Sequence, residues 1–265
     1  MKIAIIGKNG YIGSYLYSYL SAFFDVEGYG RSDLDITKEE EVERFFLDHK
    51  YDVIILTAAS KDVKRLETDE KYAYDINVKP VELFLKYADD EKLLFFSSDY
   101  VFDGKIGDYE DDFPTCPVTV YGKTKVMAEE LLIKSSKNYI ILRTAAVLGK
   151  GSVFFDWLVE SLRHGTKLEM FDNSFFSPTC ISYLCEAVKK IIEQNCSKKI
   201  LHLVQEKRLS RYELALFVQR CLSTKCEIIP SASSFKDLSL VRSGWLERQG
   251  FDDFDTYLMK EIKNV

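Results

Sequence analysis

The chain has 265 residues, of which 46% are hydrophobic and 29% charged, so it is long enough to bury a sizeable core. Its formal net charge of -6 excludes the basic footprint on which non-specific nucleic-acid binding depends. The N-terminus runs directly into an apolar strand, and no uninterrupted apolar run is long enough to span a bilayer. We therefore expect a cytoplasmic protein that binds neither nucleic acid nor membrane.

The six cysteines are scattered along the chain and form no CxxC or Cys/His metal spacing. We expect them to be reduced and mostly buried, and we predict no metal site.

Short apolar runs alternate with helical patterns through the first half of the chain. The predicted strands are Lys2–Ile6, Asp25–Tyr29, Asp52–Ala59, Lys92–Ser98 and Tyr139–Thr144. The predicted helices are Tyr11–Phe23, Lys38–His49, Glu70–Tyr87 and Val120–Ser135. Continuous apolar runs are typical of strands that are covered on both faces, as in a parallel sheet. The alternation predicts an α/β fold, a Rossmann-type doubly wound parallel sheet.

After Gly149 the alternation of apolar runs and helical patterns becomes less regular. We predict helices over Phe154–Arg163, Ile181–Gln194 and Arg211–Cys221, a loop over Asp172–Thr179 and a strand over Lys199–Val204. The expected organisation is a dinucleotide-binding domain over residues 1–150. A smaller mixed C-terminal substrate-binding region over residues 151–265 is expected to interleave partly with it.

A glycine-rich loop joins the first strand to the first helix. In "IAIIGKNGYIGS", Gly7 permits a tight turn, Gly10 lets backbone N–H groups approach a pyrophosphate, and Gly13 lets helix and strand pack closely. The diphosphate then lies at the positive end of the helix dipole. The cofactor-binding residues predicted in this loop are Gly7, Asn9, Gly10, Tyr11, Ile12 and Gly13.

The end of the second strand decides between the two nicotinamide cofactors. A carboxylate there binds the ribose 2′-OH of NAD, whereas an arginine accommodates the 2′-phosphate of NADP. "YGRSDLDIT" places Arg31 and Ser32 just past the strand, and Asp35 and Ile36 are better placed beside the adenine. NADPH is the predicted cofactor, with NADH as the alternative.

Tyr121 and Lys125, in "VYGKTK", are four residues apart and share one face of a helix. Ser98 ends a buried strand at the carboxyl edge, where doubly wound folds bind ligands. Ser98 could donate a hydrogen bond to a substrate carbonyl and Tyr121 could donate the proton. The Lys125 ammonium would lower the pKa of the phenol. These three side chains are sufficient for carbonyl reduction with a hydride from the cofactor.

These motifs resemble those of the extended short-chain dehydrogenase/reductases, and more closely the dTDP-4-dehydrorhamnose reductase family. The matching stretches, in that family's order, include "GRSDLDIT", "SSDYVFDG", "YGKTKVMAEELL", "ILRTAAVLG" and "FFSPT". The resemblance is dense to about Gly149 and thin afterwards. It implies NADPH-dependent reduction of the 4-keto group of a nucleotide-linked 4-keto-6-deoxy sugar, in the biosynthesis of deoxysugars and surface polysaccharides. A homodimer is a further expectation.

The same resemblance assigns further site residues. Ser98 and Tyr121 would hold the C4 carbonyl, with Asp99 and Tyr100 close to the sugar, while Lys125 would hold the nicotinamide ribose. The residues implied to lie beside the cofactor are Ala58, Ala59 and Ser60, which end the third strand, and Asn77. For Asn77, a hydrogen-bonding role within its helix is the alternative.

The segments that the resemblance implies bind the substrate depart from the family pattern. Ala146 stands where the family usually has a Trp, and no Arg-Pro segment is recognisable in "FKDLSLVRSGWL", where Arg242 is a candidate substitute. A different sugar, a different nucleotide or a loss of catalysis would each fit these changes. Two alternatives follow: a non-catalytic NADP-binding subunit, like the regulatory subunit of methionine adenosyltransferase, and an epimerase or dehydratase.

Overall fold

The computed structural model describes residues 1–60, 62–194, 196 and 200–265. They form two compact units that are not contiguous in sequence. The first comprises residues 1–103, 114–143 and 191–201, and the second comprises residues 104–113, 144–190 and 202–265. In the described part of the chain, no helix is both long and apolar enough to cross a membrane.

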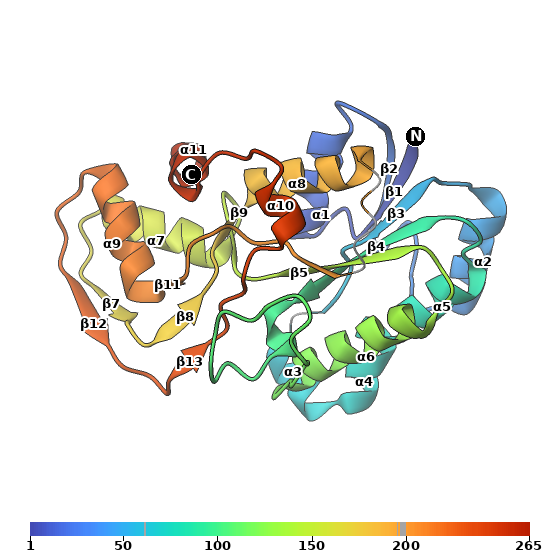
Figure 1. The fold of residues 1–265 in the computed structure, drawn as a ribbon, viewed down its shortest axis with the longest axis horizontal. Coiled ribbons are helices and arrows are strands. Elements are labelled where there is room, and N and C mark those ends of the chain that lie inside the picture. Colours follow the sequence, from blue (N-terminus) through green and yellow to red (C-terminus); the bar gives the residue numbers. More distant parts are fainter. Residues whose placement is uncertain (61, 195, 197–199) are drawn as a thin grey trace. The chain divides into compact units, whose positions relative to one another are not determined.

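The first unit contains a six-stranded sheet with the order β10-β5-β4-β3-β1-β2 (Figure 1). Its strands are β1 (Lys2–Ile6), β2 (Asp25–Tyr29), β3 (Val53–Leu56), β4 (Lys92–Ser98), β5 (Tyr139–Thr144) and β10 (Ile200–His202). β1 pairs in parallel with both β2 and β3, and β3 pairs in parallel with β4. The strand order therefore reverses direction at β1, which is the switch point where doubly wound folds bind ligands. The predicted fold class is confirmed.

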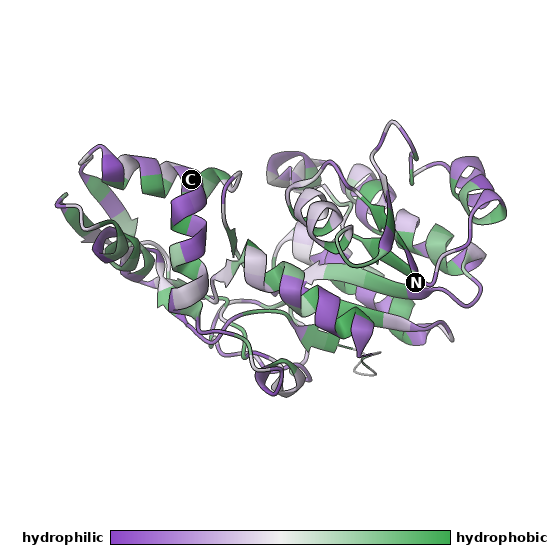
Figure 2. Ribbon diagram, turned by 90° about the horizontal axis from the view of Figure 1, so that it is seen from above, coloured by the Kyte–Doolittle hydropathy of each residue, from purple (hydrophilic) through white to green (hydrophobic). Residues whose placement is uncertain are grey.

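Alternate side chains of these strands face a core that helices cover. The helices α2 (Glu39–Asp48), α5 (Lys79–Tyr87) and α6 (Val120–Lys134) contribute Phe45, Phe84 and Leu132, among others, to one core cluster with the strands. α1 (Tyr11–Leu20) contacts β1 and β2 and buries Leu16 and Leu20. The central strands of the sheet appear largely hydrophobic in Figure 2, as expected for strands that are covered on both faces.

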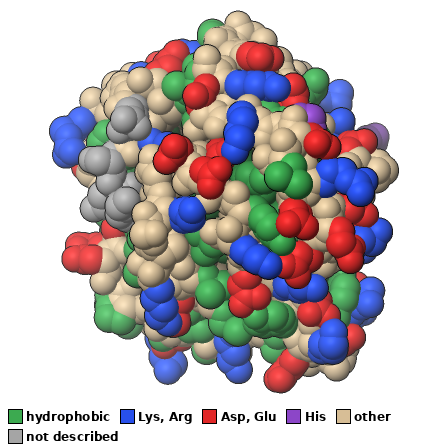
Figure 3. All heavy atoms as spheres, turned by 90° about the vertical axis from the view of Figure 1, so that its right-hand side faces the viewer, with side chains coloured by type: hydrophobic (Ala, Val, Ile, Leu, Met, Phe, Trp, Pro, Cys, Tyr) green, Lys and Arg blue, Asp and Glu red, His purple; other side chains and the backbone are tan. Residues whose placement is uncertain are grey.

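The surface of this unit over α2 and α5 is charged and mixed in sign. Figure 3 shows cationic and anionic side chains interspersed on this side of the molecule. Lys86 pairs with Glu39 and Lys50 pairs with Asp89, in each case between exposed side chains. Such exposed pairs contribute little to stability, but their mixed signs keep the surface well solvated.

Two predicted elements of the first unit differ in the structure. The helix predicted over Glu70–Tyr87 is two helices, α4 (Glu70–Asn77) and α5, because Pro80 lies in the first turn of α5 and cannot continue a preceding helix. The strand predicted over Asp52–Ala59 ends at Leu56, since Thr57–Ser60 leave the ladder at the carboxyl edge. A short helix, α3 (Val63–Thr68), precedes α4 and was not predicted.

The second unit is built from three small sheets and several helices. The sheets have the orders β11-β8-β13, β12-β7 and β6-β9. The strands are β6 (Val147–Leu148), β7 (Leu168–Phe171), β8 (Ser174–Phe176), β9 (Thr179–Cys180), β11 (Leu209–Ser210), β12 (Ile228–Ser231) and β13 (Lys236–Asp237). The helices are α7 (Val153–Arg163), α8 (Ile181–Glu193), α9 (Arg211–Leu222), α10 (Gly244–Glu247) and α11 (Phe254–Asn264).

The helix predictions over α7, α8 and α9 are confirmed to within one or two residues, whereas the loop prediction over Asp172–Thr179 was wrong. That segment contains β8, whose partners β11 and β13 come from segments more than thirty residues later in the chain. Its pairing therefore depends on long-range contacts that no local pattern encodes. The strand predicted over Lys199–Val204 is shorter, at Ile200–His202, and Lys199 lies outside the described residues.

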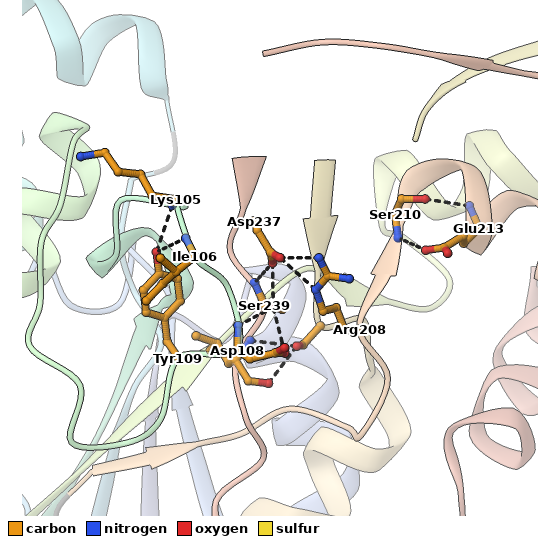
Figure 4. Close-up of polar contacts among 11 residues, drawn as sticks. Lys105, Ile106, Asp108, Tyr109, Arg208, Ser210, Glu213, Asp237 and Ser239 are labelled. Atoms are coloured by element: carbon orange, nitrogen blue, oxygen red, sulfur yellow. Dashed lines mark hydrogen bonds and ion pairs between the residues drawn. The ribbon is translucent and has the colours of Figure 1, made fainter. Parts of the chain in front are cut away.

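The buried carboxylate of Asp237 links several segments of the second unit (Figure 4). Asp237 is 1% exposed and accepts hydrogen bonds from the Nε and Nη2 atoms of Arg208, at 2.9 and 2.5 Å, and from the Ser239 hydroxyl at 2.7 Å. The Ser239 hydroxyl in turn accepts a hydrogen bond from the backbone N–H of Asp108 at 2.7 Å. This network ties residues 104–113 to β13.

Candidate active site

The turn between β1 and α1 requires glycine at two positions. Gly7 has φ +98°, and a Cβ atom there would lie 2.8 Å from the backbone nitrogen of Ala58. A Cβ atom on Gly13 would lie 2.2 Å from the carbonyl oxygen of Gly7, so only glycine lets α1 pack this close to the turn. Gly10 is the N-cap of α1 and supplies no side chain that could cap the helix.

A cavity of about 380 Å³ lies in the first unit beside this turn. Nine of the predicted cofactor residues line it: Gly7, Asn9, Gly10, Arg31, Asp35, Ile36, Ala58, Ala59 and Ser60. Seven further residues that the sequence reasoning did not select complete the lining: Ile6, Tyr29, Gly30, Leu34, Thr57, Tyr72 and Ile76. The cavity therefore lies where the strand order reverses direction, and it is lined by residues at the ends of β1, β2 and β3.

The end of β2 presents a cation to this cavity. Gly30 follows the strand directly, and a Cβ atom on it would lie 2.2 Å from the Nδ2 atom of Asn9, so any side chain at this position would require Asn9 to move. The next side chain, Arg31, is 75% exposed and lies 3.9 Å from Asp35. Asp33 is directed elsewhere: its carboxylate accepts the N–H of Gly30 and pairs with Lys8, and both contacts lower its pKa.

Some predicted residues do not line the cavity. Tyr11, Ile12 and Gly13 form the first turn of α1, and Ser32 is exposed. Asn77 is 3% exposed and forms hydrogen bonds to two segments. Its Oδ1 accepts the backbone N–H of Ser60 at 2.9 Å, and its Nδ2 donates to the Thr124 hydroxyl at 3.2 Å. The loop that ends β3 is therefore held to α6 by one side chain.

The candidate proton donor lies on α6, whose start is fixed by sequence-local contacts. The Thr119 hydroxyl caps the helix by accepting the N–H of Gly122 at 3.0 Å. A Cβ atom on Gly122 would lie 2.1 Å from the Tyr100 carbonyl oxygen, so glycine permits the close approach of α6 to the turn that follows β4. The sequence reasoning did not select Gly122, although a glycine inside a helical pattern is a signal of such an approach.

Tyr121 is 8% exposed and Lys125 is 3% exposed, and both lie on the buried face of α6. Tyr121 packs in one cluster with Leu66, and the cavity-lining Tyr72 and Ile76 belong to the same cluster. The Lys125 Nζ donates a hydrogen bond to the Phe96 carbonyl oxygen at 2.9 Å, and it lies 5.9 Å from the centroid of the Tyr121 ring.

The pKa of the Tyr121 phenol is raised above its ordinary value of 10.0, chiefly because burial disfavours the phenolate. The Asp99 carboxylate raises the pKa further, while the Ser98 hydroxyl lowers it. This direction is opposite to the lowering that the sequence predicted from Lys125. A general acid must be protonated before it acts; a phenol is already protonated at neutral pH at its ordinary pKa, and the raised pKa leaves that state unchanged.

The candidate hydrogen-bond donor to a carbonyl is Ser98, at the end of β4. Its hydroxyl donates to the Asp99 Oδ1 at 2.8 Å and accepts the N–H of Tyr100 at 3.3 Å. The ring of Tyr100 contacts that of Tyr121 edge to face, with centroids 5.9 Å apart. The structure thus brings the predicted Ser98, Asp99, Tyr100, Tyr121 and Lys125 together in the first unit.

The residues present fit a phosphorylated dinucleotide. The cavity volume lies in the range typical of ligand sites, and its floor is the glycine turn, where side chains would block the approach of a diphosphate. Arg31 offers a guanidinium at the position where a 2′-phosphate is recognised, and the residue that directly follows β2 is a glycine rather than the carboxylate that would select an unphosphorylated ribose.

The strand order, the glycine turn and the phenol–lysine helix define the class of this protein: a dinucleotide-binding α/β protein of the extended short-chain dehydrogenase/reductase type. A family model described as the RmlD substrate binding domain matches residues 1–242. The chain belongs to this family, and the resemblance stated from its motifs is confirmed.

Individual relatives agree with this assignment. The chain is 31% identical over 228 residues to a dTDP-4-dehydrorhamnose reductase of Aggregatibacter actinomycetemcomitans, which corresponds to 82% of this chain and 78% of the relative. A crystal structure of the Clostridium acetobutylicum counterpart covers 99% of both chains, with a TM-score of 0.89 and 25% identity. The Bacillus anthracis enzyme in complex with NADP shares the fold, with a TM-score of 0.90 and 22% identity over 100% of this chain and 99% of that one.

The segments that depart from the family pattern lie in the second unit. Ala146 accepts the backbone N–H of Thr179 at 3.0 Å through its carbonyl oxygen, beside the pairing of β6 with β9. Arg242 lies 3.5 Å from the Glu206 carboxylate, and its side chain is 19% exposed. In the described residues, Arg242 is therefore held in an ion pair within its own unit.

Proposed function

We propose that this protein reduces the 4-keto group of a nucleotide-linked 4-keto-6-deoxy sugar with NADPH, in deoxysugar and surface polysaccharide biosynthesis. The observation that carries the proposal is the placement of Ser98, Tyr121 and Lys125 in the same unit as a glycine-turn cavity with an arginine at its edge. The curated relatives named dTDP-4-dehydrorhamnose reductase support the same chemistry.

The residues that would hold the cofactor are those of the cavity. The first turn of α1 would face the diphosphate, Arg31 the 2′-phosphate, and Ala58–Ser60 the nicotinamide half. We still predict that the cofactor contacts Tyr11, Ile12, Gly13 and Ser32, through their backbone atoms or at the edge of the site. When bound, NADPH supplies the hydride that reduces the carbonyl carbon. Because Asn77 holds the Ser60 loop to α6, we assign it a role in aligning the two halves of the site.

The chain's own chemistry is proton delivery and orientation. Tyr121 donates its phenolic proton to the carbonyl oxygen as the carbonyl becomes a hydroxyl, and the phenol is protonated at neutral pH before the reaction. The Ser98 hydroxyl turns from Asp99 to the same oxygen and orients it. Lys125 holds the nicotinamide ribose, and Asp99 and Tyr100 lie where the sugar would bind.

The experiment is NADPH oxidation against a panel that contains dTDP-4-dehydrorhamnose and the corresponding UDP- and GDP-linked 4-keto-6-deoxy sugars. We expect turnover with at least one member of the panel. No turnover across the panel, with NADPH binding intact, would refute the reductase and support the non-catalytic binding subunit. The altered segments around Ala146 and Arg242 are the reason why the panel varies the nucleotide as well as the sugar.

Two further expectations belong to this proposal. A homodimer and a cytoplasmic location are predicted, and light scattering of the purified protein together with fractionation of the producing cells would test them.

A further inference from the structure

One face of α6 carries three polar side chains at intervals of four residues: Tyr121, Lys125 and Glu129. This spacing places them in a single stripe along the helix. The stripe lies against the last three residues of β4. The Lys125 Nζ donates to the Phe96 carbonyl oxygen at 2.9 Å, and the Ser97 hydroxyl donates to the Glu129 Oε1 at 2.5 Å. The third strand residue, Ser98, interacts with the Tyr121 phenol.

The third member of this stripe, Glu129, is a buried charge with a buried partner. Glu129 and Arg143 are each 2% exposed, and the Arg143 Nη2 lies 2.7 Å from the Glu129 Oε2. The Arg143 Nε donates to both carboxylate oxygens, at 3.1 and 3.3 Å, and the guanidinium lies 5.2 Å from the ring centroid of Phe102. Because Arg143 is on β5, this carboxylate connects α6 to two neighbouring strands.

A buried ion pair of this kind contributes little net stability, since removing two charges from water offsets most of their attraction. Its effect is directional: charge-assisted hydrogen bonds in a low-dielectric interior fix the geometry of the groups that share them. Ser97 is covalently adjacent to Ser98, and Glu129 lies one helical turn beyond Lys125. The contact between Ser97 and Glu129 therefore sets the position of Ser98 relative to Tyr121 and Lys125.

We propose that Glu129, oriented by Arg143 and acting through Ser97, is a positioning residue that fixes the Tyr121 and Lys125 face of α6 against the end of β4. This inference rests on the proposed reductase function for its kinetic consequence, but its geometric consequence can be measured without any substrate.

Ser97→Ala is the test variant. Glu129→Gln would leave the Arg143 guanidinium buried without its carboxylate and would destabilise the fold itself. Ser97→Ala removes one hydroxyl and keeps the ion pair whole. Ser97→Thr restores the hydroxyl at the same position. The matched control is Ser210→Ala, which removes another fully buried serine hydroxyl, the N-cap of α9 (Figure 4).

The first readout is the reactivity of Lys125. Brief acetylation with acetic anhydride, followed by mass spectrometry, gives its labelling rate relative to the exposed Lys123 on the same helix. We expect this ratio to rise about tenfold in Ser97→Ala, because α6 loses its Glu129 contact with β4 while it keeps the one with β5, and local opening between α6 and β4 then exposes the amine. Ser97→Thr and Ser210→Ala should keep the wild-type ratio. An unchanged ratio in Ser97→Ala would overturn the proposal.

The second readout is steady-state reduction of whichever panel sugar the wild-type protein turns over. In Ser97→Ala we expect kcat to fall by at least about tenfold while KM for NADPH changes by less than about twofold, because misalignment affects the transition state rather than cofactor binding. Ser97→Thr should recover most of the loss. If Ser97→Ala and Ser210→Ala lower kcat equally, the role of Ser97 is only structural and the proposal fails. If the wild-type protein turns over no sugar, the proposed function fails, and the Lys125 ratio still decides the inference.

Discussion

The two units use buried polar side chains in different ways. In the first unit several of them lie at the ends of β4 and β5 and on α6, where Tyr121 packs in one cluster with the cavity-lining Tyr72 and Ile76. In the second unit the buried Asp237 bonds to Arg208 and Ser239, and Asp111 bonds to Ser243 and to the N–H of His202. There the polar groups connect separate segments of the chain to one another.

This difference indicates that the polar side chains of the first unit serve a reaction, whereas those of the second unit maintain its structure. Side chains at strand ends are positioned by the sheet, which is rigid and continuous, so they can serve a reaction. The polar groups of the second unit hold together residues 104–113 and 202–265, which are far apart in sequence. We therefore expect substitutions at the candidate site in the first unit to change catalysis and cofactor choice, and substitutions of the buried polar groups in the second unit to change stability first.

Tyr121→Phe should have the largest effect. We expect carbonyl reduction to fall by about 10²–10⁴-fold, because the proton donor is lost, while NADPH affinity stays nearly unchanged. Steady-state kinetics and a fluorescence titration of NADPH measure the two quantities. The control is Tyr139→Phe, which alters another buried tyrosine of the same unit, on β5. Full activity of Tyr121→Phe would remove the proton donor from the proposed mechanism.

Arg31→Ala should change cofactor choice. Loss of charge-assisted contacts to a phosphate typically costs a factor of about 10 to 100, so the dissociation constant of NADPH should rise by that factor. The NADH constant should change by less than about threefold, since that cofactor carries no 2′-phosphate. Arg44→Ala, at an exposed position on α2, is the matched control. Equal weakening of both cofactors would contradict the assignment of Arg31.

Asp237→Asn tests the second unit. The variant keeps the shape of the side chain but removes the charge that holds Arg208, so we expect the free energy of unfolding to fall by about 1–3 kcal/mol. Urea denaturation measures this change, with the exposed Asp252→Asn as the control. NADPH affinity should stay at the wild-type value. A variant that unfolds normally but no longer binds NADPH would break the distinction between the two units.

Glu27→Gln should have the smallest effect, and it depends on pH. Hydrogen bonds from Lys2 and Tyr51 lower the pKa of Glu27 from 4.5 to about 2. Its contribution to stability is therefore present above pH 4.5 and is lost as the pH falls from 4.5 to about 2. Because the pair with Lys2 is partly exposed, we expect less than about 1 kcal/mol. Urea midpoints at pH 7 and pH 3 should differ less in the variant than in the wild type, and an equal difference would show that Glu27 contributes nothing.

Local rules were sufficient to predict much of the first unit. The glycine turn, the parallel strands and the four-residue spacing of Tyr121 and Lys125 each depend on a few consecutive residues, and the structure contains all of them. The lining residues Tyr72 and Ile76, which reach the cavity from α4, were not predicted, because no local pattern reveals which face of that helix turns inward. The same reasoning also missed Gly122, whose close approach to Tyr100 depends on tertiary packing.

The second unit could not be predicted in the same way. Its small strands pair across long stretches of sequence, and the hydrogen bond between Asp108 and Ser239 joins residues 131 positions apart. The net shift of the Tyr121 pKa is upward, whereas the sequence predicted a lowering by Lys125, and the reason is similar. The burial of the phenol, which dominates the shift, is a property of the folded unit rather than of the YxxxK spacing.

The most direct test of the proposed activity follows the fate of a label. NADPH that carries deuterium at its hydride position would be incubated with the protein and the panel sugar that it turns over, and the product would be analysed by NMR. The proposed reaction predicts one deuterium at C4 of the sugar for each NADPH consumed by the wild-type protein, and the same label at a rate about 10²–10⁴-fold lower with Tyr121→Phe. Deuterium at another carbon, or NADPH consumption without a labelled sugar, would contradict it.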